Sequence, residues 1–329
     1  MEQHVAEQPE PGAIRDLRDG THAILFAVVQ SAETGTTRAG QPYLKLELSD
    51  RTGRLRARRW DCTPEEIAAL RPGTVVKVGG AYSVHERWGP QLIVERVRVA
   101  ADEEYDLTEM LDGPPRSAEQ METDLRELIE TIQDGSLRAL LDALIGPGSA
   151  LWEGFRIAPA AKHYHQAYRH GLLEHCLTVA QGVSAMAATF PGIDRDVAVT
   201  GALLHDIGKL EAYTDDPLAI DLTDAGRLQG EIPLGYYVTR RAIEDLPGFP
   251  PDRAQAVLHI ILSHHGALEH GSPVLPATRE ATLVHMIDNL GGRLGSFDRI
   301  EKGLADGEAW SGFDRALGGG AFFAGRAAA

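Results

Sequence analysis

The sequence predicts a multi-domain protein in which a small all-β barrel is followed by an all-α helical bundle. Its 329 residues exceed the roughly 250–300 at which a single hydrophobic core stops growing. Up to about residue 100, apolar residues alternate in short runs between glycine-rich turns, whereas from about residue 155 they recur with a helical period. Charge divides similarly: residues 15–100 hold 14 basic and 10 acidic side chains, and the remainder holds 18 and 38. Such asymmetry indicates two segments with different roles.

The overall composition is that of a globular protein without a membrane span. Apolar residues make up 43% and charged residues 24%, and no apolar run approaches the roughly 20 residues that cross a bilayer. Residues 1–14 begin MEQHVAEQPEPG, which predicts a disordered N-terminus and no signal peptide. Two isolated cysteines, Cys62 and Cys176, predict no disulfide and favour a cytoplasmic location. The net charge of −16 disfavours nucleic acid as a partner of the whole surface.

Residues 15–102 are expected to form the barrel. YLKLELSD (43–50) and RLRARRW (54–60) alternate between apolar and polar residues, which predicts two strands. Between them DRTGR is a turn in which Gly53 supplies a permissive backbone. GTVVKVGGAYSV and PQLIVERVRV predict further strands, and short strands about ten residues apart are typical of a small barrel.

One face of this barrel has the composition of a surface for single-stranded nucleic acid. Arginines at every second position share one face, and aromatic residues lie nearby in the sequence. Such a face suits single-stranded nucleic acid, because cations bind phosphates and aromatic rings stack on bases. The candidates are Tyr43, Arg54, Arg56, Arg58, Trp60, Tyr82 and Trp88. An aromatic core beside solvated arginines explains the same pattern, since alternation does not reveal which face is buried.

The rest of the chain is predicted to be helical. A helical linker at 103–154 contains SAEQMETDLRELIETI, in which Ser117 and Gln120 have the spacing of a helix cap. A bundle follows at 155–305, and the low-complexity residues 306–329 are expected to be a loosely held tail.

Polar residues interrupt the apolar helices of this bundle at several points. A lone buried histidine is usually a satisfied core residue, but each unpaired polar group in a core costs roughly 1–3 kcal/mol. Several together are better explained by a divalent metal, whose imidazole and carboxylate ligands packed helices can supply from distant positions. Gly266 is expected to end one helix, and Lys209 to share a face with His205. The candidate ligands are His175, His205, Asp206, Glu231, His264, His265 and Asp288.

The order H…HD…HH…D, with LLHDIGK around the adjacent pair, resembles the HD-domain metal-dependent phosphohydrolases. Four longer segments are similar to the YhaM-type 3′→5′ exoribonucleases. These are YLKLELSDRTGRLRARRWD (43–61), APAAKHYHQAYRHGLLEHCLTVA (158–180), GALLHDIGKLEAY (201–213) and ILSHHGALEHGSPVLPATREATLVHMIDNL (261–290). The resemblance covers roughly residues 15 to 300.

This resemblance implies an OB-fold at 15–102, an HD domain at 155–305, and release of nucleoside 5′-monophosphates from the 3′ end of single-stranded RNA, which is favoured over DNA. It also implies a divalent metal, Mn²⁺ before Mg²⁺, Fe²⁺ or Co²⁺, as one or two ions. Asp206 is expected to bridge the ions, and Lys209 to neutralise charge on the phosphate. A homo-oligomer is compatible with the sequence.

Two departures from the family pattern bear on the site. Glu231 stands where relatives commonly have a histidine, which favours a hard cation and puts a second metal site in question. His165-Gln166 and His170-Gly171 replace paired histidines and a double glycine. We expect that change to affect substrate contacts, including one from His165, more than metal binding.

Two other functions compete with the exonuclease, whereas a purely structural helical domain is the least favoured, because so many ionisable groups lie in its apolar helices. One is an HD phosphodiesterase acting on small or cyclic nucleotides, although HHGALEHGSPVLP lacks the GYP element of the cyclic di-GMP class. The other is a catalytically silent nucleic-acid-binding protein, to which only Glu231 points.

Overall fold

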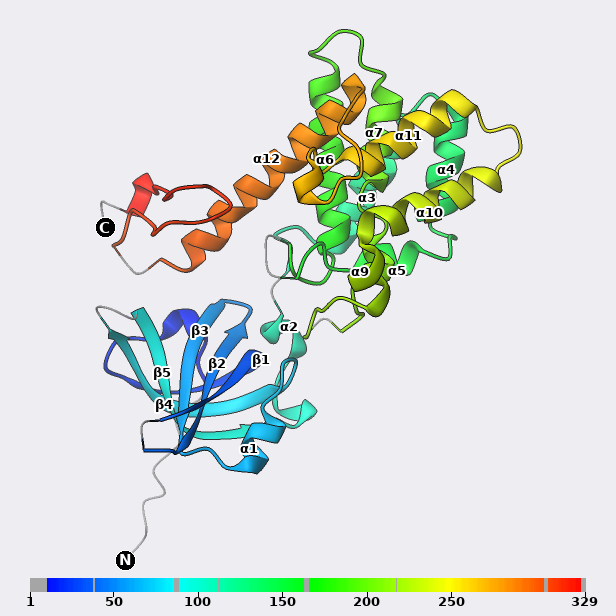
Figure 1. Cartoon of the computed structure of the whole chain (residues 1–329). Helices are drawn as coiled ribbons and strands as arrows, with labels where there is room; N and C mark the ends of the chain where they lie inside the picture. The colour runs from blue at the N-terminus through cyan, green and yellow to red at the C-terminus, as the bar shows by residue number, and fades with distance from the viewer. Residues whose placement is uncertain are drawn as a thin grey trace, which may run out of the picture. The chain divides into compact units, whose positions relative to one another are not determined.

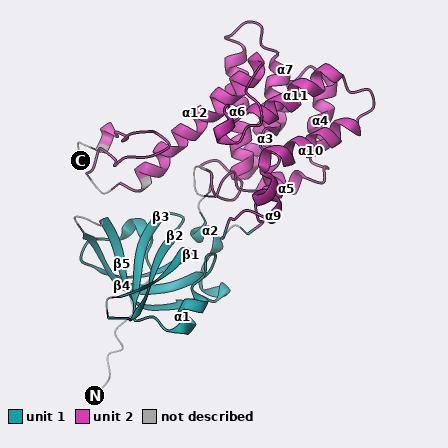
Figure 2. Cartoon of the chain, viewed as in Figure 1, with its two compact units in different colours: residues 1–112, 216–219 teal, residues 113–215, 220–329 magenta. Residues whose placement is uncertain are grey.

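The structure is a computed structural model that describes residues 11–37, 39–85, 89–111, 113–162, 166–216, 218–304 and 307–326. It divides into two compact units (Figures 1 and 2). Unit 1 comprises residues 1–112 and 216–219, and unit 2 comprises 113–215 and 220–329. The predicted order, an all-β barrel followed by an all-α bundle, is confirmed.

Five strands close the barrel of unit 1 in the order β1-β2-β3-β5-β4. Neighbouring strands run antiparallel except β3 and β5, which are parallel. The strands are β1 (His22–Thr36), β2 (Pro42–Asp50), β3 (Gly53–Trp60), β4 (Val75–His85) and β5 (Gly89–Val99). Short helices accompany them: η1 (Ile14–Asp16), α1 (Pro64–Ala69), η2 (Asp102–Glu104) and α2 (Leu107–Met110).

The turn between β2 and β3 depends on Asp50 rather than on Gly53. One Asp50 carboxylate oxygen accepts hydrogen bonds from the backbone of Thr52 and Gly53, and the other accepts from the backbone of Ile14. Gly53 does not adopt a positive φ. The expected permissive glycine is therefore unnecessary, because a side chain that caps its own turn replaces it.

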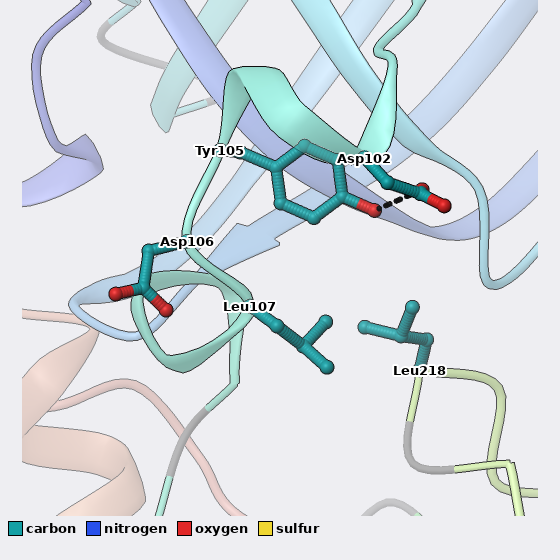
Figure 3. A pocket seen from close by; sticks show the side chains of 5 residues that line it. All are labelled: Asp102, Tyr105, Asp106, Leu107 and Leu218. Carbon is teal, nitrogen blue, oxygen red and sulfur yellow. Dashed lines mark hydrogen bonds between the residues drawn. The ribbon is translucent and has the colours of Figure 1, made fainter.

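Residues 216–219 join unit 1 although their sequence neighbours on both sides belong to unit 2. Leu218 packs with Tyr105 against a small apolar cluster that includes Val28, Val75 and Met110. Leu218 also lines a pocket whose other walls come from the segment after β5, where the Tyr105 hydroxyl donates to Asp102 (Figure 3). The chain thus passes between the units at more than one point.

Unit 2 is a helical bundle around one large apolar core. Its helices are α3 (Ala118–Glu130), α4 (Gly135–Ile145), α5 (Trp152–Ile157), α6 (Gly171–Ala187), α7 (Arg195–Leu204), α8 (Lys209–Ala212), α9 (Asp224–Gln229), α10 (Glu231–Glu244), α11 (Pro251–Ser263), η3 (Leu268–His270), α12 (Arg279–Lys302) and η4 (Ala324–Arg326). Of the helices in the described residues, none is both long and apolar enough to cross a membrane.

Two segments differ from expectation. The predicted linker at 103–154 is divided, because residues up to 112 belong to unit 1 while α3, α4 and α5 contribute to the core of the bundle. The expected cap is present, since the Ser117 hydroxyl accepts from the Gln120 backbone. Within 306–329, the described residues 307–326 are folded: Trp310 pairs with Phe322, and the Phe323 ring packs against Phe297 of α12.

Candidate functional site

The polar residues predicted to bind metal come from helices that pack together in unit 2. His175 lies on α6, His205 and Asp206 directly follow α7, and Asp288 lies on α12. Helix α7 packs against α6, α11 and α12, which brings these positions together (Figure 1). His264 and His265 follow α11, where Gly266 adopts a φ of +77° as expected for a helix end.

Five of the seven predicted ligands form one cluster, in which ligand atoms within two overlapping groups lie within 4.8 Å of one another. His175 Nε2 is 3.1 Å from Asp206 Oδ2 and 3.2 Å from Asp288 Oδ1. His205 Nε2 is 3.1 Å from His175 Nε2. Atoms that are each about 2.1 Å from one ion and at right angles lie roughly 3 Å apart, so these spacings suit a shared divalent cation.

The histidines are held in the tautomer that metal binding requires. In each, Nδ1 lies 2.7–3.0 Å from a carbonyl oxygen. Since a carbonyl only accepts, Nδ1 must donate, and in a neutral ring the Nε2 lone pair is left to bind. The acceptors are the backbone carbonyls of Ala202 for His205, Ile261 for His264 and His270 for His265, and the side-chain carbonyl of Gln166 for His175.

Two buried atoms of the cluster are placed so that a cation could bind between them. Within the described residues, Asp206 Oδ1 and His264 Nε2 have no hydrogen-bond partner, and they lie 3.5 Å apart. Both side chains are almost completely buried. Two facing acceptors without a proton or cation between them are destabilising, so the donor set fits a metal ion.

The pKa shifts in the cluster arise because its ionisable groups lie close together and are buried. Burial opposes a charge on His175, but hydrogen bonds to Asp206 and Asp288 outweigh it and raise the pKa of His175 to about 9. Burial also opposes ionisation of Asp206, yet Lys209 and His205 hold the pKa of Asp206 well below its usual value. The carboxylates therefore remain ionised and attract positive charge into the centre.

Lys209 contacts Asp206 and does not share a helix face with His205. Helix α7 ends at Leu204, and a turn over residues 205–208 separates it from α8. The Lys209 ammonium lies 2.6 Å from Asp206 Oδ2. That carboxylate raises the pKa of Lys209 in spite of burial, so Lys209 stays charged beside the cluster.

Glu231 and His265 lie together at the edge of the cluster. Glu231 is the first residue of α10, and its Oε1 is 3.7 Å from His265 Nε2. The His265 ring is adjacent to that of His264, with centroids 4.4 Å apart. Both side chains are 27% exposed, whereas Asp206 is 2% exposed. The structure thus separates an inner set of five residues from an outer pair.

The predicted arginines of β3 lie on the outside of the barrel. Leu55 and Ala57 are buried, so the alternating Arg54, Arg56 and Arg58 of β3 face outward. The face of β3 that is buried is therefore the one with Leu55 and Ala57, and not the one with the arginines.

Tyr43 and Trp60 form a pair beside this arginine row. They are cross-strand partners on β2 and β3, with ring centroids 4.9 Å apart, and the Arg58 guanidinium lies 5.9 Å from the Trp60 ring. Gly35 on β1 leaves room for the Tyr43 ring, since a Cβ there would lie 2.4 Å from it. Tyr82 instead packs against the barrel core. Trp88 and His165 lie outside the described residues.

Two residues contact the predicted ligands in ways that the sequence did not predict. Gln166 accepts from His175, and His285 on α12 donates through Nδ1 to the carbonyl of His264 at 2.7 Å. His285 and Asp288 are three residues apart on one helix, a spacing that marks a common face. Gln166 precedes α6 in a loop, where no helical spacing reveals it.

Comparison with known proteins agrees with this geometry. A family model described as HD domain matches residues 172–292. A protein named 3′-5′ exoribonuclease YhaM from Geobacillus sp. (strain WCH70) is 30% identical over 291 residues, which cover 88% of each chain. The protein of the same name from Bacillus subtilis (strain 168) is 29% identical over 86% of this chain and 88% of its own. Among solved structures, a domain of replication protein A from Methanococcus maripaludis is 21% identical over 27% of this chain and 93% of that one, with a TM-score of 0.23.

Proposed function

Because the chain belongs to the YhaM family of 3′-5′ exoribonucleases, we propose that it is a metal-dependent hydrolase that shortens single-stranded RNA from the 3′ end and releases nucleoside 5′-monophosphates. The observation on which the proposal chiefly rests is the convergence of imidazole Nε2 atoms and carboxylate oxygens in unit 2. Orphaned buried acceptors in the same cluster support it.

The inner set is proposed to hold the metal through His175, His205, Asp206, His264 and Asp288. When bound, a divalent ion supplies the Lewis acidity that activates water and polarises the scissile phosphate. Asp206 presents its two oxygens to different neighbours, His175 and His264, so both oxygens could contribute to metal binding. Glu231 and His265 are proposed to complete a second position, where a carboxylate favours Mn²⁺ or Mg²⁺.

Lys209 is proposed to have two roles. Its ion pair keeps Asp206 ionised at neutral pH. Its positive charge also offsets the negative charge that builds on the phosphate oxygens during hydrolysis. Both roles require a charged ammonium, which the raised pKa of Lys209 ensures.

The outer face of β2 and β3 is proposed to hold the strand that is being shortened. Tyr43 and Trp60 offer adjacent aromatic rings for stacking on bases, and Arg54, Arg56 and Arg58 offer cations for phosphates. The acidic remainder of the chain repels polyanions and restricts them to this face and to the metal centre.

The direct test is to incubate the purified protein with single-stranded RNA labelled at its 5′ end, in the presence of Mn²⁺. We expect a ladder that shortens from the 3′ end, released nucleoside 5′-monophosphates, and no products when a chelator is present. Labelled single-stranded DNA in parallel measures the preference for RNA. An intact long RNA together with hydrolysis of cyclic or short nucleotides would instead identify a small-nucleotide phosphodiesterase.

A further inference from the structure

His175 differs from the other histidines of the cluster in how its ring is held. His205, His264 and His265 donate through Nδ1 to backbone carbonyls, which no substitution removes. His175 donates to the side chain of Gln166, at 3.0 Å. We propose that Gln166 is a positioning residue of the metal centre, which fixes the tautomer and orientation of His175; this inference rests on the proposed metal-dependent function.

The loop before α6 is built to hold Gln166 in place. Gln166 and His170 have φ values of +59° and +67°, and they are two of only three non-glycine residues with positive φ among those described. Such conformations are unfavourable for residues other than glycine and persist only where the surroundings enforce them. The backbone carbonyl of Gln166 accepts from the Ala160 backbone N–H at 3.1 Å, and a Cβ at Gly171 would lie 2.1 Å from that backbone oxygen. The backbone is thus locked against the start of α6.

Loss of the Gln166 oxygen would remove the side-chain acceptor that favours a proton on His175 Nδ1. A neutral imidazole without an acceptor at Nδ1 can place its proton on Nε2, the atom that faces Asp206 and Asp288. That form donates to the carboxylates and cannot bind a metal ion. Partners that orient ligands in this way commonly change metal affinity 10–100-fold when they are removed.

The sequence comparison predicts a different role for this position. From the resemblance in sequence, we expect the replacement of paired histidines by His165-Gln166 to alter substrate contacts more than metal binding. The structure instead gives the Gln166 side chain a partner inside the metal cluster. A glutamine keeps one acceptor oxygen beside Nδ1 and adds no charge, whereas a glutamate would make the imidazole a stronger ligand.

The experiment compares Gln166→Met, which keeps length but removes the acceptor, with Gln166→Glu, which keeps shape and acceptor. Binding of Mn²⁺ to the full chain is measured by calorimetry without RNA, and thermal unfolding of the metal-free protein checks the fold. Gln181→Met, an exposed position on the same helix as His175, is the matched control. We expect Gln166→Met to weaken Mn²⁺ binding about 10–100-fold. Gln166→Glu should bind at least as tightly as the unchanged protein.

The inference is overturned if Gln166→Met binds Mn²⁺ like the unchanged protein, or if Gln166→Glu loses as much affinity as Gln166→Met. If Gln166→Met does not fold, Gln166→Ala removes the same oxygen with less bulk and decides between the same outcomes. Failure of the proposed metal site is distinguishable, because the unchanged protein would then bind no Mn²⁺, and failure of the exonuclease activity alone appears in the RNA assay and not in the Mn²⁺ titration.

Discussion

Asp206 is the residue on which the proposed metal centre depends most. One of its carboxylate oxygens contacts His175, His205 and Lys209, and the other has no hydrogen-bond partner among the described residues. A buried carboxylate with such different surroundings at its two oxygens is poorly explained by fold stability alone, since the unpaired oxygen opposes folding. Its use as a metal ligand accounts for both oxygens.

Replacing Asp206 with Ala should therefore abolish RNA hydrolysis and leave the helical fold intact. Metal activation contributes several kcal/mol to lowering the barrier, so the rate should fall well below a tenth of normal. The measurement is the initial rate at saturating Mn²⁺, with helicity followed by circular dichroism. Glu127→Ala, an exposed carboxylate on α3, serves as control. A residual rate above about a tenth would remove Asp206 from the ligand set.

Glu231 is the second residue to test, because the resemblance in sequence predicts a histidine at its position. Its position 3.7 Å from His265 predicts that Glu231→Ala weakens metal binding about 10–100-fold, as loss of a ligand-shell member commonly does. Glu231→His should remain active with a changed metal preference. Calorimetric titration with Mn²⁺ and Mg²⁺ makes the comparison, with Glu244→Ala at the other end of α10 as control. An unchanged titration in Glu231→Ala would place this residue outside the site.

At this scale, sequence reasoning identified residue types better than contacts. The adjacent His-Asp and His-His pairs were recognisable because ionisable groups are rare in apolar helices. The Nδ1 partners of the four histidines could not be found, since those of the paired histidines are backbone carbonyls and that of His175, Gln166, lies in a loop without a period.

At the scale of elements, the break between α7 and α8 determines what Lys209 touches. The sequence predicts one helix through this stretch, because apolar residues keep their period across it. The structure ends α7 at Leu204 and starts α8 at Lys209. The intervening turn directs Asp206 toward His175 and places Lys209 against Asp206. A period reports which face is apolar but not where the hydrogen-bond ladder stops.

The strands of the barrel show the same division between what a pattern reveals and what it does not. Alternation gave the two faces of β3 correctly, and only packing shows that Leu55 and Ala57 point inward. The Asp50 turn was hidden because it uses a carboxylate from the end of β2 in place of a glycine conformation.

The arginine row of β3 provides the prediction that belongs to this scale. Changing Arg54, Arg56 and Arg58 together to Ala should weaken binding of a long single-stranded RNA and reduce the salt dependence of binding by up to about three counterions. Cleavage of a dinucleotide should change little, because so short a substrate does not extend beyond the metal centre.

A charge-matched control removes three exposed arginines from unit 2, Arg138, Arg240 and Arg241. If the control weakens RNA binding as much as the β3 variant does, net charge and not the β3 face is responsible. If dinucleotide cleavage falls together with binding of the long RNA, the barrel acts as a structural support.

At the scale of the whole molecule, the barrel segment and the rest of the chain differ in net charge. The barrel segment at 15–100 has a small basic excess, whereas the rest of the chain is strongly acidic and contains the cluster of histidines and carboxylates. Only there, among the groups described, does the structure collect several ionisable side chains in a buried cluster able to hold a metal.

Metal binding should therefore change how stability depends on pH. The pKa of His175 is about 9 in the metal-free fold, against about 6.5 for a free histidine. Its protonated form stabilises the metal-free protein below about pH 6.5, and this contribution is lost as the pH rises to about 9. Because a bound ion replaces that proton, the increase in Tm caused by Mg²⁺ should grow between pH 6.5 and 9. Thermal unfolding with Mg²⁺ or with chelator tests this, and an equal increase at both pH values would contradict it.

The central claim is that the His175, His205, Asp206, His264 and Asp288 side chains hold a divalent ion. The most direct test is anomalous X-ray diffraction from crystals of the protein grown with Mn²⁺. We predict an anomalous peak bounded by the Nε2 atoms of the three histidines and the carboxylates of Asp206 and Asp288, and the loss of that peak in Asp206→Ala. Crystals in which Mn²⁺ scatters only at the protein surface, or in which the peak persists without Asp206, would contradict the claim.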